Sequence, residues 1–299
     1  MKLTLDKTAE VLRGAQKIVL TAHVNPDGDA IGSSLGLMHI LREMGKEVSV
    51  IIDDDIPSIF SILPGIGNIQ KTHEDMQEVP ADLLVVLDTA LDRIGKVQEF
   101  VKAPVLNIDH HITNKEDKVR VYVDPKRAAT CEIVYELAKE LEIPFTRDSA
   151  LCIYTGIATD SGFFRYSNTT PFTMRAAAEL MEYEVMPNYV SEAMEVKSYE
   201  VVHGMAKALS TMNVFHDGKA AGLFLDDELS ASIESTEGFI DMIRVIEGVD
   251  VAVLLKCKAE NVCRVSMRSK RTDVSSIAMS FGGGGHIKAA GCTLEMPFE

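Results

Sequence analysis

Short apolar runs alternate with longer stretches of helical periodicity over roughly the first 190 residues. The apolar runs cover residues 17–22, 48–52, 83–87 and 105–108, and the helical patterns cover residues 30–44, 132–141, 149–158 and 170–181. Nearly continuous apolar strands are typical of a sheet that is buried on both faces. Their alternation with helices predicts an α/β domain built on a parallel sheet.

The pattern changes after residue 188. Residues 189–210 are helical and more charged, which predicts a connecting helix. Beyond it, strands are predicted at 212–215, 220–225, 249–256, 262–267 and 291–294, with helices at 240–246 and 274–281. A chain of 299 residues is long for one hydrophobic core. We therefore expect a first domain over 1–188, a connecting helix over 189–210, and a smaller α/β domain over 211–299.

Metal-seeking side chains follow the predicted strands of the first domain. The loops that leave the carboxyl ends of parallel strands meet at one crevice. The side chains come from the segment after the first strand, from the ends of two further strands, and from the end of a helix: His23, Asp27, Asp29, Asp88, Asp109, His110, His111 and Asp160.

Each of these segments has an ordinary structural explanation when it is taken alone. Asp27-Gly28-Asp29 is a common turn with a helix cap, and His23 could be a satisfied core histidine. Gathered in one crevice, however, the carboxylates would repel one another and lose solvation unless cations bound among them. Carboxylate oxygens mixed with imidazole nitrogens favour Mn²⁺ over Mg²⁺. The combination indicates a two-metal hydrolase.

Composition places the chain among ordinary globular proteins. No apolar run approaches the ~18 residues of a membrane span, and no continuous apolar stretch follows the N-terminus as in a signal peptide. The five cysteines are dispersed and form no Cys-x-x-Cys pair. We expect them to be small buried hydrophobes in a reducing cytoplasm, with no disulfide.

Charge constrains the partners. A net charge of −15 argues against a protein that coats long nucleic acid through a broad basic surface. Residues 256–288 nevertheless carry seven basic and two acidic side chains, and they contain the run Gly282–Gly285. A solvated hairpin with a flexible loop is one interpretation. A cradle for a short anionic ligand is the other, since glycines let a backbone approach a phosphate closely.

The motifs in combination resemble the DHH phosphoesterase superfamily. The resemblance is carried by His23-x-x-Pro-Asp27-Gly28-Asp29, by Asp109-His110-His111 and by Thr159-Asp160-Ser161. Arg268-Ser269-Lys270, Phe281 followed by Gly282–Gly285 and His286, and Ala289-Ala290-Gly291 resemble the DHHA1 domain of its nanoRNase/pAp-phosphatase branch. The resemblance covers nearly the whole chain, and it implies an active site in the cleft between the two domains.

The resemblance also implies roles for individual residues. One cation would take His23, Asp27 and Asp88, and the other would take Asp29, Asp88, His110 and Asp160. His111 would approach the substrate phosphate or the leaving oxygen, and Asp109 would support its loop, with direct ligation as the alternative. The DHHA1 contacts to substrate would come from Arg268, Ser269, Gly283, Gly284, Gly285 and His286. Thr130 and Arg165 are secondary candidates near the crevice.

The function that this implies is a Mn²⁺-dependent phosphodiesterase that degrades very short RNA from one end and dephosphorylates adenosine 3′,5′-bisphosphate (pAp). Cleavage of cyclic dinucleotides or of their linear product pApA is the alternative for the same site. Inorganic pyrophosphatase activity and an exonuclease for long single-stranded DNA are disfavoured by the glycine motif and by the small, acidic chain. A non-catalytic nucleotide-binding regulator is disfavoured because all six ligand positions are occupied. The patterns leave a homodimer open.

Overall fold

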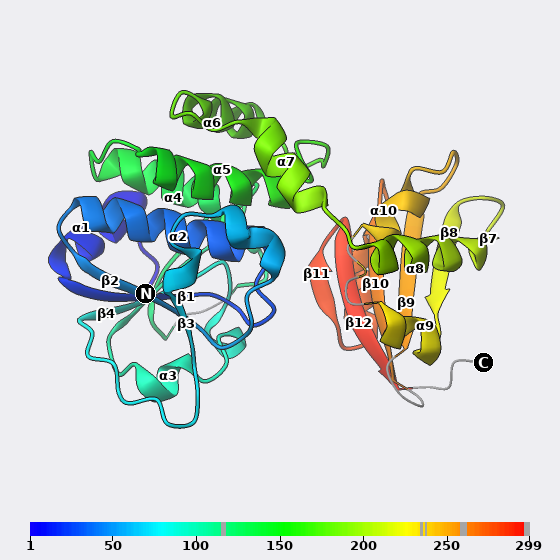
Figure 1. Ribbon diagram of the computed structural model, residues 1–299, viewed down its shortest axis with the longest axis horizontal. Helices are drawn as coiled ribbons and strands as arrows, with labels where there is room; N and C mark the ends of the chain where they lie inside the picture. The colour runs from blue at the N-terminus through cyan, green and yellow to red at the C-terminus, as the bar shows by residue number, and fades with distance from the viewer. Residues whose placement is uncertain (115–117, 234–235, 237, 258–261, 296–299) are drawn as a thin grey trace. The chain divides into compact units, whose positions relative to one another are not determined.

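The computed structural model describes residues 1–114, 118–233, 236, 238–257 and 262–295, and its contacts divide the chain into two units. The units are Met1–Val196 and Lys197–Glu299. Each unit is built around its own six-stranded sheet (Figure 1).

The sheet of the first unit is parallel throughout, as predicted. Its strand order is β3-β2-β1-β4-β5-β6, so the direction in which the chain adds strands reverses between β1 and β4. Ligand sites of open α/β sheets lie beyond the carboxyl ends of the strands at such a reversal. The strands are β1 (Lys17–Thr21), β2 (Glu47–Ile52), β3 (Ile69–Lys71), β4 (Leu83–Leu87), β5 (Val105–Asp109) and β6 (Arg120–Val123).

Helices cover both faces of this sheet (Figure 1). Successive residues of a strand point to opposite faces, and Leu20 packs in the larger apolar cluster while Val19 packs in the smaller one. The larger cluster is covered by α2, α4 and α5, and the smaller one by α3. The helices are α1 (Leu5–Gly14), α2 (Gly28–Glu43), α3 (Val97–Phe100), α4 (Thr130–Glu140), α5 (Arg147–Asp160), α6 (Pro171–Met181) and α7 (Pro187–Glu195), with short 3₁₀ turns at Ser58–Ile62, Ile66–Asn68 and Leu91–Arg93.

Helices α2 and α5 cross at a distance that only small residues permit. A Cβ atom at Gly32 would lie 2.6 Å from the Cys152 carbonyl oxygen, and one at Gly36 would lie 2.6 Å from Ile153 Cγ1. Both glycines are on α2, and both obstructing residues are on α5. The close crossing also brings Gly28, the first residue of α2, against Thr159 near the end of α5, where a Cβ atom at Gly28 would lie 2.2 Å from Thr159 Oγ1.

The second unit is a smaller α/β unit with a mixed sheet in the order β11-β12-β10-β9-β8-β7. Only β8 and β9 pair in parallel, and the other neighbours are antiparallel. Its described elements are α8 (Tyr199–Ser210), β7 (Asn213–Phe215), β8 (Ala220–Leu225), α9 (Asp227–Ser232), α10 (Phe239–Arg244), β9 (Val251–Cys257), β10 (Val262–Ser269), α11 (Val274–Ser280), β11 (Gly284–His286) and β12 (Ala289–Glu295).

Two helices replace the single connecting helix that was predicted over 189–210. Helix α7 ends at Glu195, because Val196 turns to extended backbone with ψ 128°. Ser198 then starts α8 by accepting a hydrogen bond from the Val201 amide with its side chain. An N-cap of this kind marks a new helix start within one periodic stretch. The division between the units falls at this break.

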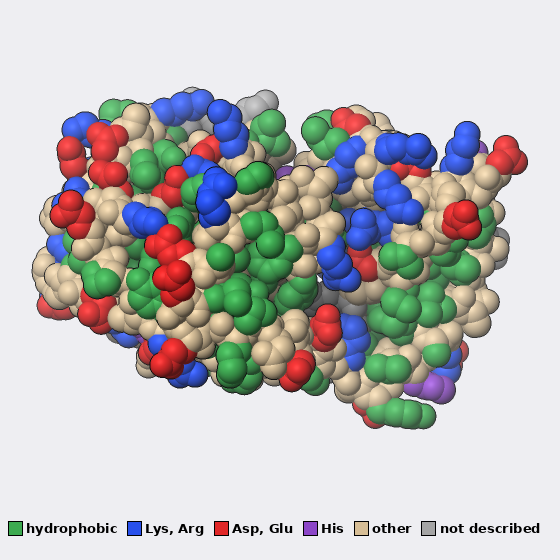
Figure 2. Space-filling model, turned by 90° about the horizontal axis from the view of Figure 1, so that it is seen from above, with side chains coloured by type: hydrophobic (Ala, Val, Ile, Leu, Met, Phe, Trp, Pro, Cys, Tyr) green, Lys and Arg blue, Asp and Glu red, His purple; other side chains and the backbone are tan. Residues whose placement is uncertain are grey.

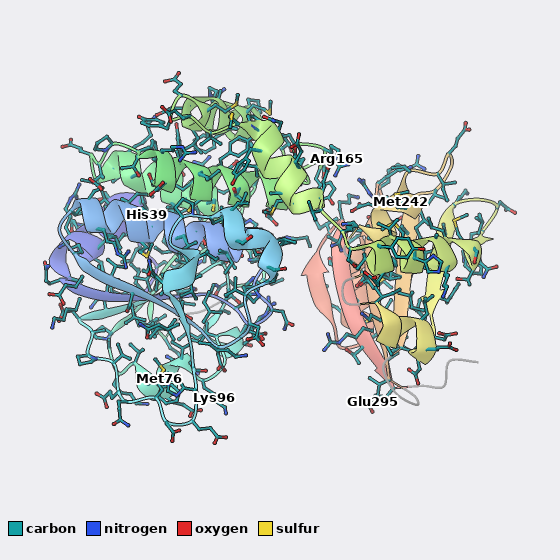
Figure 3. All side chains as sticks on the ribbon, viewed as in Figure 1. His39, Met76, Lys96, Arg165, Met242 and Glu295 are labelled. Atoms are coloured by element: carbon teal, nitrogen blue, oxygen red, sulfur yellow. A yellow bond between two sulfur atoms is a disulfide. The ribbon has the colours of Figure 1, made fainter. Side chains whose placement is uncertain are left out.

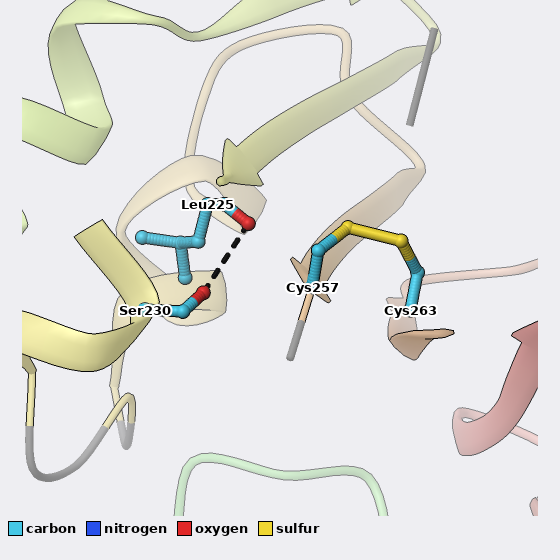
Figure 4. Close-up of a disulfide and its surroundings, with 4 residues drawn as sticks. All are labelled: Leu225, Ser230, Cys257 and Cys263. Atoms are coloured by element: carbon cyan, nitrogen blue, oxygen red, sulfur yellow. Dashed lines mark hydrogen bonds between the residues drawn. A yellow bond between two sulfur atoms is a disulfide. The ribbon is translucent and has the colours of Figure 1, made fainter. Parts of the chain in front are cut away.

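The prediction that the five cysteines form no disulfide is wrong for Cys257 and Cys263, which are joined (Figure 4). The two residues are directly opposite each other on the antiparallel strands β9 and β10. Their six-residue separation in sequence did not reveal this register. Cys131, Cys152 and Cys292 are free. The cysteines therefore no longer support the expectation of a reducing compartment.

The distribution of side chains on the surface agrees with the composition of an ordinary globular protein. Basic, acidic and hydrophobic side chains are interspersed over the face that Figure 2 shows. Among the described residues, no helix combines the length and apolarity that crossing a bilayer requires.

Candidate metal centre

Asp88 lies at the centre of the predicted cluster in the first unit. It follows β4 directly, its backbone has a left-handed φ of 61°, and its side chain is 3% exposed. Its Oδ2 atom lies 3.5 Å from His23 Nε2, and its Oδ1 atom lies 3.5 Å from His110 Nε2. The two oxygens of one carboxylate thus face two different imidazoles, as a bridge between two cations requires.

His23 and Asp27 complete a first group with Asp88. The Nδ1 atom of His23 bonds the Val24 carbonyl oxygen at 3.0 Å, which leaves Nε2 directed at Asp88 and at Asp27 Oδ2, 3.8 Å away. Asp27 caps α2 with its other oxygen, which accepts from the Asp29 and Ala30 amides. Desolvation opposes ionisation, but the hydrogen bond and charge of His23 outweigh it and lower the pKa of Asp27 to about 2.

Asp29 and His110 form a second group with Asp88. His110 Nε2 is 3.9 Å from Asp29 Oδ2 and 3.5 Å from Asp160 Oδ2, so Asp160 borders this group through His110. The Nδ1 atom of His110 faces the Arg127 carbonyl oxygen at 3.2 Å, which again leaves Nε2 for the cluster. The side chains of Asp27 and Asp160 are 60% and 29% exposed, so the otherwise buried cluster opens to solvent beside them.

The distances between these carboxylate oxygens and imidazole nitrogens are those expected for ligands that share an ion. Two ligand atoms that each lie about 2.1 Å from one ion are about 3.0–4.2 Å apart, whereas contacts beyond 3.5 Å are long for hydrogen bonds. Burial and the neighbouring Asp29 and Asp27 carboxylates raise the pKa of Asp88 well above its ordinary value. A cation between the carboxylates would remove this penalty. The donor set of buried carboxylates and imidazoles therefore suits divalent cations.

Thr130 is a further member of the cluster that the sequence placed only among secondary candidates. It is fully buried, and its hydroxyl donates to Asp88 Oδ1 at 3.0 Å. Its backbone amide donates to Asp29 Oδ2 at 2.6 Å, and the Cys131 amide donates to Asp29 Oδ1 at 2.9 Å. The N-terminus of α4 thus holds Asp29 with the amides that a helix leaves unpaired. One residue orients two carboxylates of the cluster.

Asp109 supports the loop that carries the two histidines. Its Oδ1 atom accepts from the His110 and His111 amides and lies 2.7 Å from His111 Nδ1. Its Oδ2 atom accepts from the Asn114 side chain at 2.6 Å. Burial opposes ionisation, but these hydrogen bonds from His111 and Asn114 lower the pKa of Asp109. With both oxygens engaged, Asp109 is better suited to orienting His111 than to binding a cation.

Two asparagines of this network were not predicted from the sequence. Asn107 is fully buried in β5 and donates to the Val86 and Thr89 carbonyl oxygens. Its side-chain oxygen accepts from Asn114 at 2.7 Å. The available signal was an amide inside the apolar run Val105–Ile108, because a buried amide needs partners.

In the second unit, the register brings Arg268 and His286 to one face of the sheet. Ala289 of β12 is opposite Arg268 of β10 on one side and opposite His286 of β11 on the other. The Arg268 guanidinium donates to the Met267 carbonyl oxygen at 3.1 Å. Ser269, by contrast, is buried, and its hydroxyl donates to the Thr272 carbonyl oxygen in the following turn. Ser269 as a substrate contact stays a prediction, as do the other contacts of this unit.

The glycine run has a packing role that the sequence analysis did not separate from ligand binding. A Cβ atom at Gly283 would lie 2.1 Å from the Gly291 carbonyl oxygen, and one at Gly285 would lie 2.5 Å from that of Ala289. Gly285 also has a φ of +138°. Gly284 faces open space. Gly283 and Gly285 therefore allow β11 to approach β12, whereas Gly282 and Gly284 have open space beside them.

Two other residues that the sequence singled out are Arg165 and Lys258. Arg165, in the turns after α5, donates from Nε to the Gly162 carbonyl oxygen at 2.8 Å (Figure 3). Lys258, part of the basic stretch, lies outside the described residues.

The parallel sheet with its carboxylate–imidazole cluster, followed by a mixed-sheet unit, defines a class of phosphoesterases. Residues 17–157 match the DHH family, N-terminal domain, and residues 218–297 match the DHHA1 domain. The chain belongs to the DHH family.

Relatives from several bacteria are similar over most of the chain. The bifunctional oligoribonuclease and PAP phosphatase NrnA of Thermus thermophilus is 38% identical over 96% of this chain and 87% of its own length. The crystal structure of an exopolyphosphatase-related protein from Bacteroides fragilis has 30% identity and a TM-score of 0.86, and the match covers 96% of this chain and 90% of that one. The cyclic-di-AMP phosphodiesterase PdeA of Listeria monocytogenes is 24% identical over 96% of this chain and 46% of its own length.

Proposed function

We propose that this protein is a two-metal phosphodiesterase that removes nucleotides from one end of very short RNA and converts pAp to AMP. The observation that carries the proposal is the position of Asp88 between His23 and His110, with one carboxylate oxygen toward each. It is supported by the 38% identity to an oligoribonuclease and PAP phosphatase.

The cations would be held by the two groups that meet at Asp88. His23, Asp27 and Asp88 would hold one, and Asp29, Asp88, His110 and Asp160 the other, with Mn²⁺ favoured over Mg²⁺ by the two imidazoles. When bound, two such cations activate water and polarise a phosphoryl oxygen. Four carboxylates balance the charge of two divalent cations, so further positive charge is needed to bind an anionic phosphate.

His111 is the residue of the first unit that we assign to substrate. Its Nδ1 atom lies 2.7 Å from Asp109 Oδ1, which orients the ring, and its side chain is 26% exposed, so a phosphate or leaving oxygen can approach it from solvent. In the second unit, Arg268 and His286 would bind the nucleotide, because guanidinium engages phosphate bidentately.

The proposal is tested with purified protein and Mn²⁺ on a panel of pAp, pApA, RNA oligomers of increasing length, cyclic di-AMP and pyrophosphate. We expect release of mononucleotides from the shortest RNAs and of AMP from pAp. Ion-exchange chromatography measures these products. Preferential cleavage of cyclic di-AMP would favour the alternative that the likeness to PdeA supports. Stoichiometric Mn²⁺ binding without hydrolysis of any substrate would favour a regulatory nucleotide-binding protein instead.

Asp88→Asn is the sharpest variant for this test. Asparagine tolerates the left-handed backbone of this position better than alanine does, so the fold is retained while the charge of the bridge is lost. We expect turnover to fall at least 1,000-fold, with an unchanged circular dichroism spectrum. Asp55→Asn, at an exposed carboxylate that pairs with Lys71, is the matched control and should keep full activity. An active Asp88→Asn protein would contradict the assignment.

A further inference from the structure

A row of residues on one face of the second unit extends beyond the predicted substrate contacts. Side chains alternate between the two faces of a strand. On β10, Val265 and Met267 are buried in the apolar cluster with α11, so Arg264, Ser266 and Arg268 share the opposite face. Arg264 is exposed, while Ser266 and Arg268 are partly exposed.

The neighbouring strands arrange this face into two polar rows with a floor of small residues between them. Arg264 lies between Lys256 of β9 and Thr293 of β12. Ser266 is opposite Gly291 of β12, and Gly291 is in turn opposite Gly284 of β11. The next row contains Arg268, Ala289 and His286. The two arginines are four residues apart on one strand, so their Cα atoms are separated by about 13 Å.

A cavity of about 390 Å³ lies at the Arg264 end of this face. Arg264, Ser266 and Thr293 line it with polar side chains, and the glycines Gly282, Gly283 and Gly291 line it with backbone. Val265 and Cys292 complete the lining. The volume is within the range of small-ligand pockets. Among the described residues, the Arg264 guanidinium has no hydrogen-bond or ion-pair partner. A cavity with hydroxyls, bare backbone and one unpaired guanidinium suits a phosphate group.

We propose that this cavity is a second phosphate subsite, in which Arg264, assisted by Ser266 and Thr293, binds an internal phosphodiester of an RNA that has three or more nucleotides. The subsite rests on the proposed function, since it supposes that Arg268 and His286 bind one nucleotide of the substrate. Side chains of a strand stand roughly perpendicular to the sheet, so Arg264 and Arg268 reach different points along one bound strand. Arg264 thereby selects oligonucleotides over single nucleotides.

The experiment compares binding of pAp and of the trinucleotide pApApA by calorimetry, in the non-hydrolysing Asp88→Asn protein. Arg264→Gln should weaken binding of pApApA about 10-fold or more and change binding of pAp less than about 2-fold. The slope of log affinity against log salt should fall by about 0.7 for pApApA, the value for one phosphate contact on a single strand. Arg264→Lys should restore the slope, because it keeps the charge. Lys207→Gln, which removes an exposed charge of the same unit on α8, should change neither ligand.

Equal weakening of both ligands by Arg264→Gln would overturn the subsite, because Arg264 would then belong to the contacts of a single nucleotide. Unchanged binding of pApApA would overturn it as well. Steady-state kinetics of the otherwise wild-type enzyme provide a separate readout, in which KM for the trinucleotide rises and kcat for pAp is retained. Failure of the proposed function is a different result: the wild-type protein would hydrolyse neither substrate, whatever residue occupies position 264.

Discussion

Replacement of Thr130 by valine tests whether the residues around the cluster, and not the ligands alone, prepare it for cations. Valine has nearly the same shape but lacks the hydroxyl that donates to Asp88 Oδ1 at 3.0 Å. The backbone amides of residues 130 and 131 keep their hydrogen bonds to Asp29, so the variant changes one contact of one carboxylate. A hydrogen bond to a charged group contributes about 1.5–3 kcal/mol.

That free energy corresponds to a loss of about 10- to 100-fold in Mn²⁺ affinity, which agrees with the usual effect of removing a residue that orients a metal ligand. The affinity is measured by calorimetric titration of the metal-free protein, and Thr130→Ser is the control that retains the hydroxyl. Wild-type Mn²⁺ affinity in the Thr130→Val protein would refute the reasoning. A comparable loss in Thr130→Ser would show that the methyl group, not the hydroxyl, is responsible.

Two further predictions concern packing and pH. Gly156→Ala places a Cβ atom 2.2 Å from Cys131 Sγ and 3.0 Å from Asp29 Oδ1. It should therefore lower the free energy of unfolding, measured by urea denaturation, by about 1–3 kcal/mol. Gly14→Ala, at an open helix position, is the control and should not lower it. In metal-free protein the pKa of Asp88 is raised on folding, so the folded state holds the proton longer and stability falls as pH rises from about 4 through the raised pKa. Asp88→Asn should lack this contribution, and parallel pH profiles of the two metal-free proteins would contradict it.

Much of the fold was predictable because its strands and helices have strong periodicity. The predicted strands at 83–87 and 220–225 agree with β4 and β8 to the residue, and the helix at 274–281 agrees with α11 within one residue. The elements that were not predicted are short or lie at edges, such as β3, β6 and β11, or begin at the N-terminus, as α1 does. A strand of three or four residues contains little of the alternating pattern, so it is easily mistaken for a loop.

The chain by itself determined which chemical groups follow which strands, and therefore which side chains are available to cations. Parallel pairing directs every strand of the first sheet toward one edge, so the order of the motifs was sufficient to predict that they meet. The tertiary structure decided what local patterns do not encode: which oxygens of Asp88 face which imidazole, that the hydroxyl of Thr130 reaches Asp88, and that Cys257 is opposite Cys263. These contacts depend on strand register and helix approach, and both are set by packing between segments that are distant in sequence.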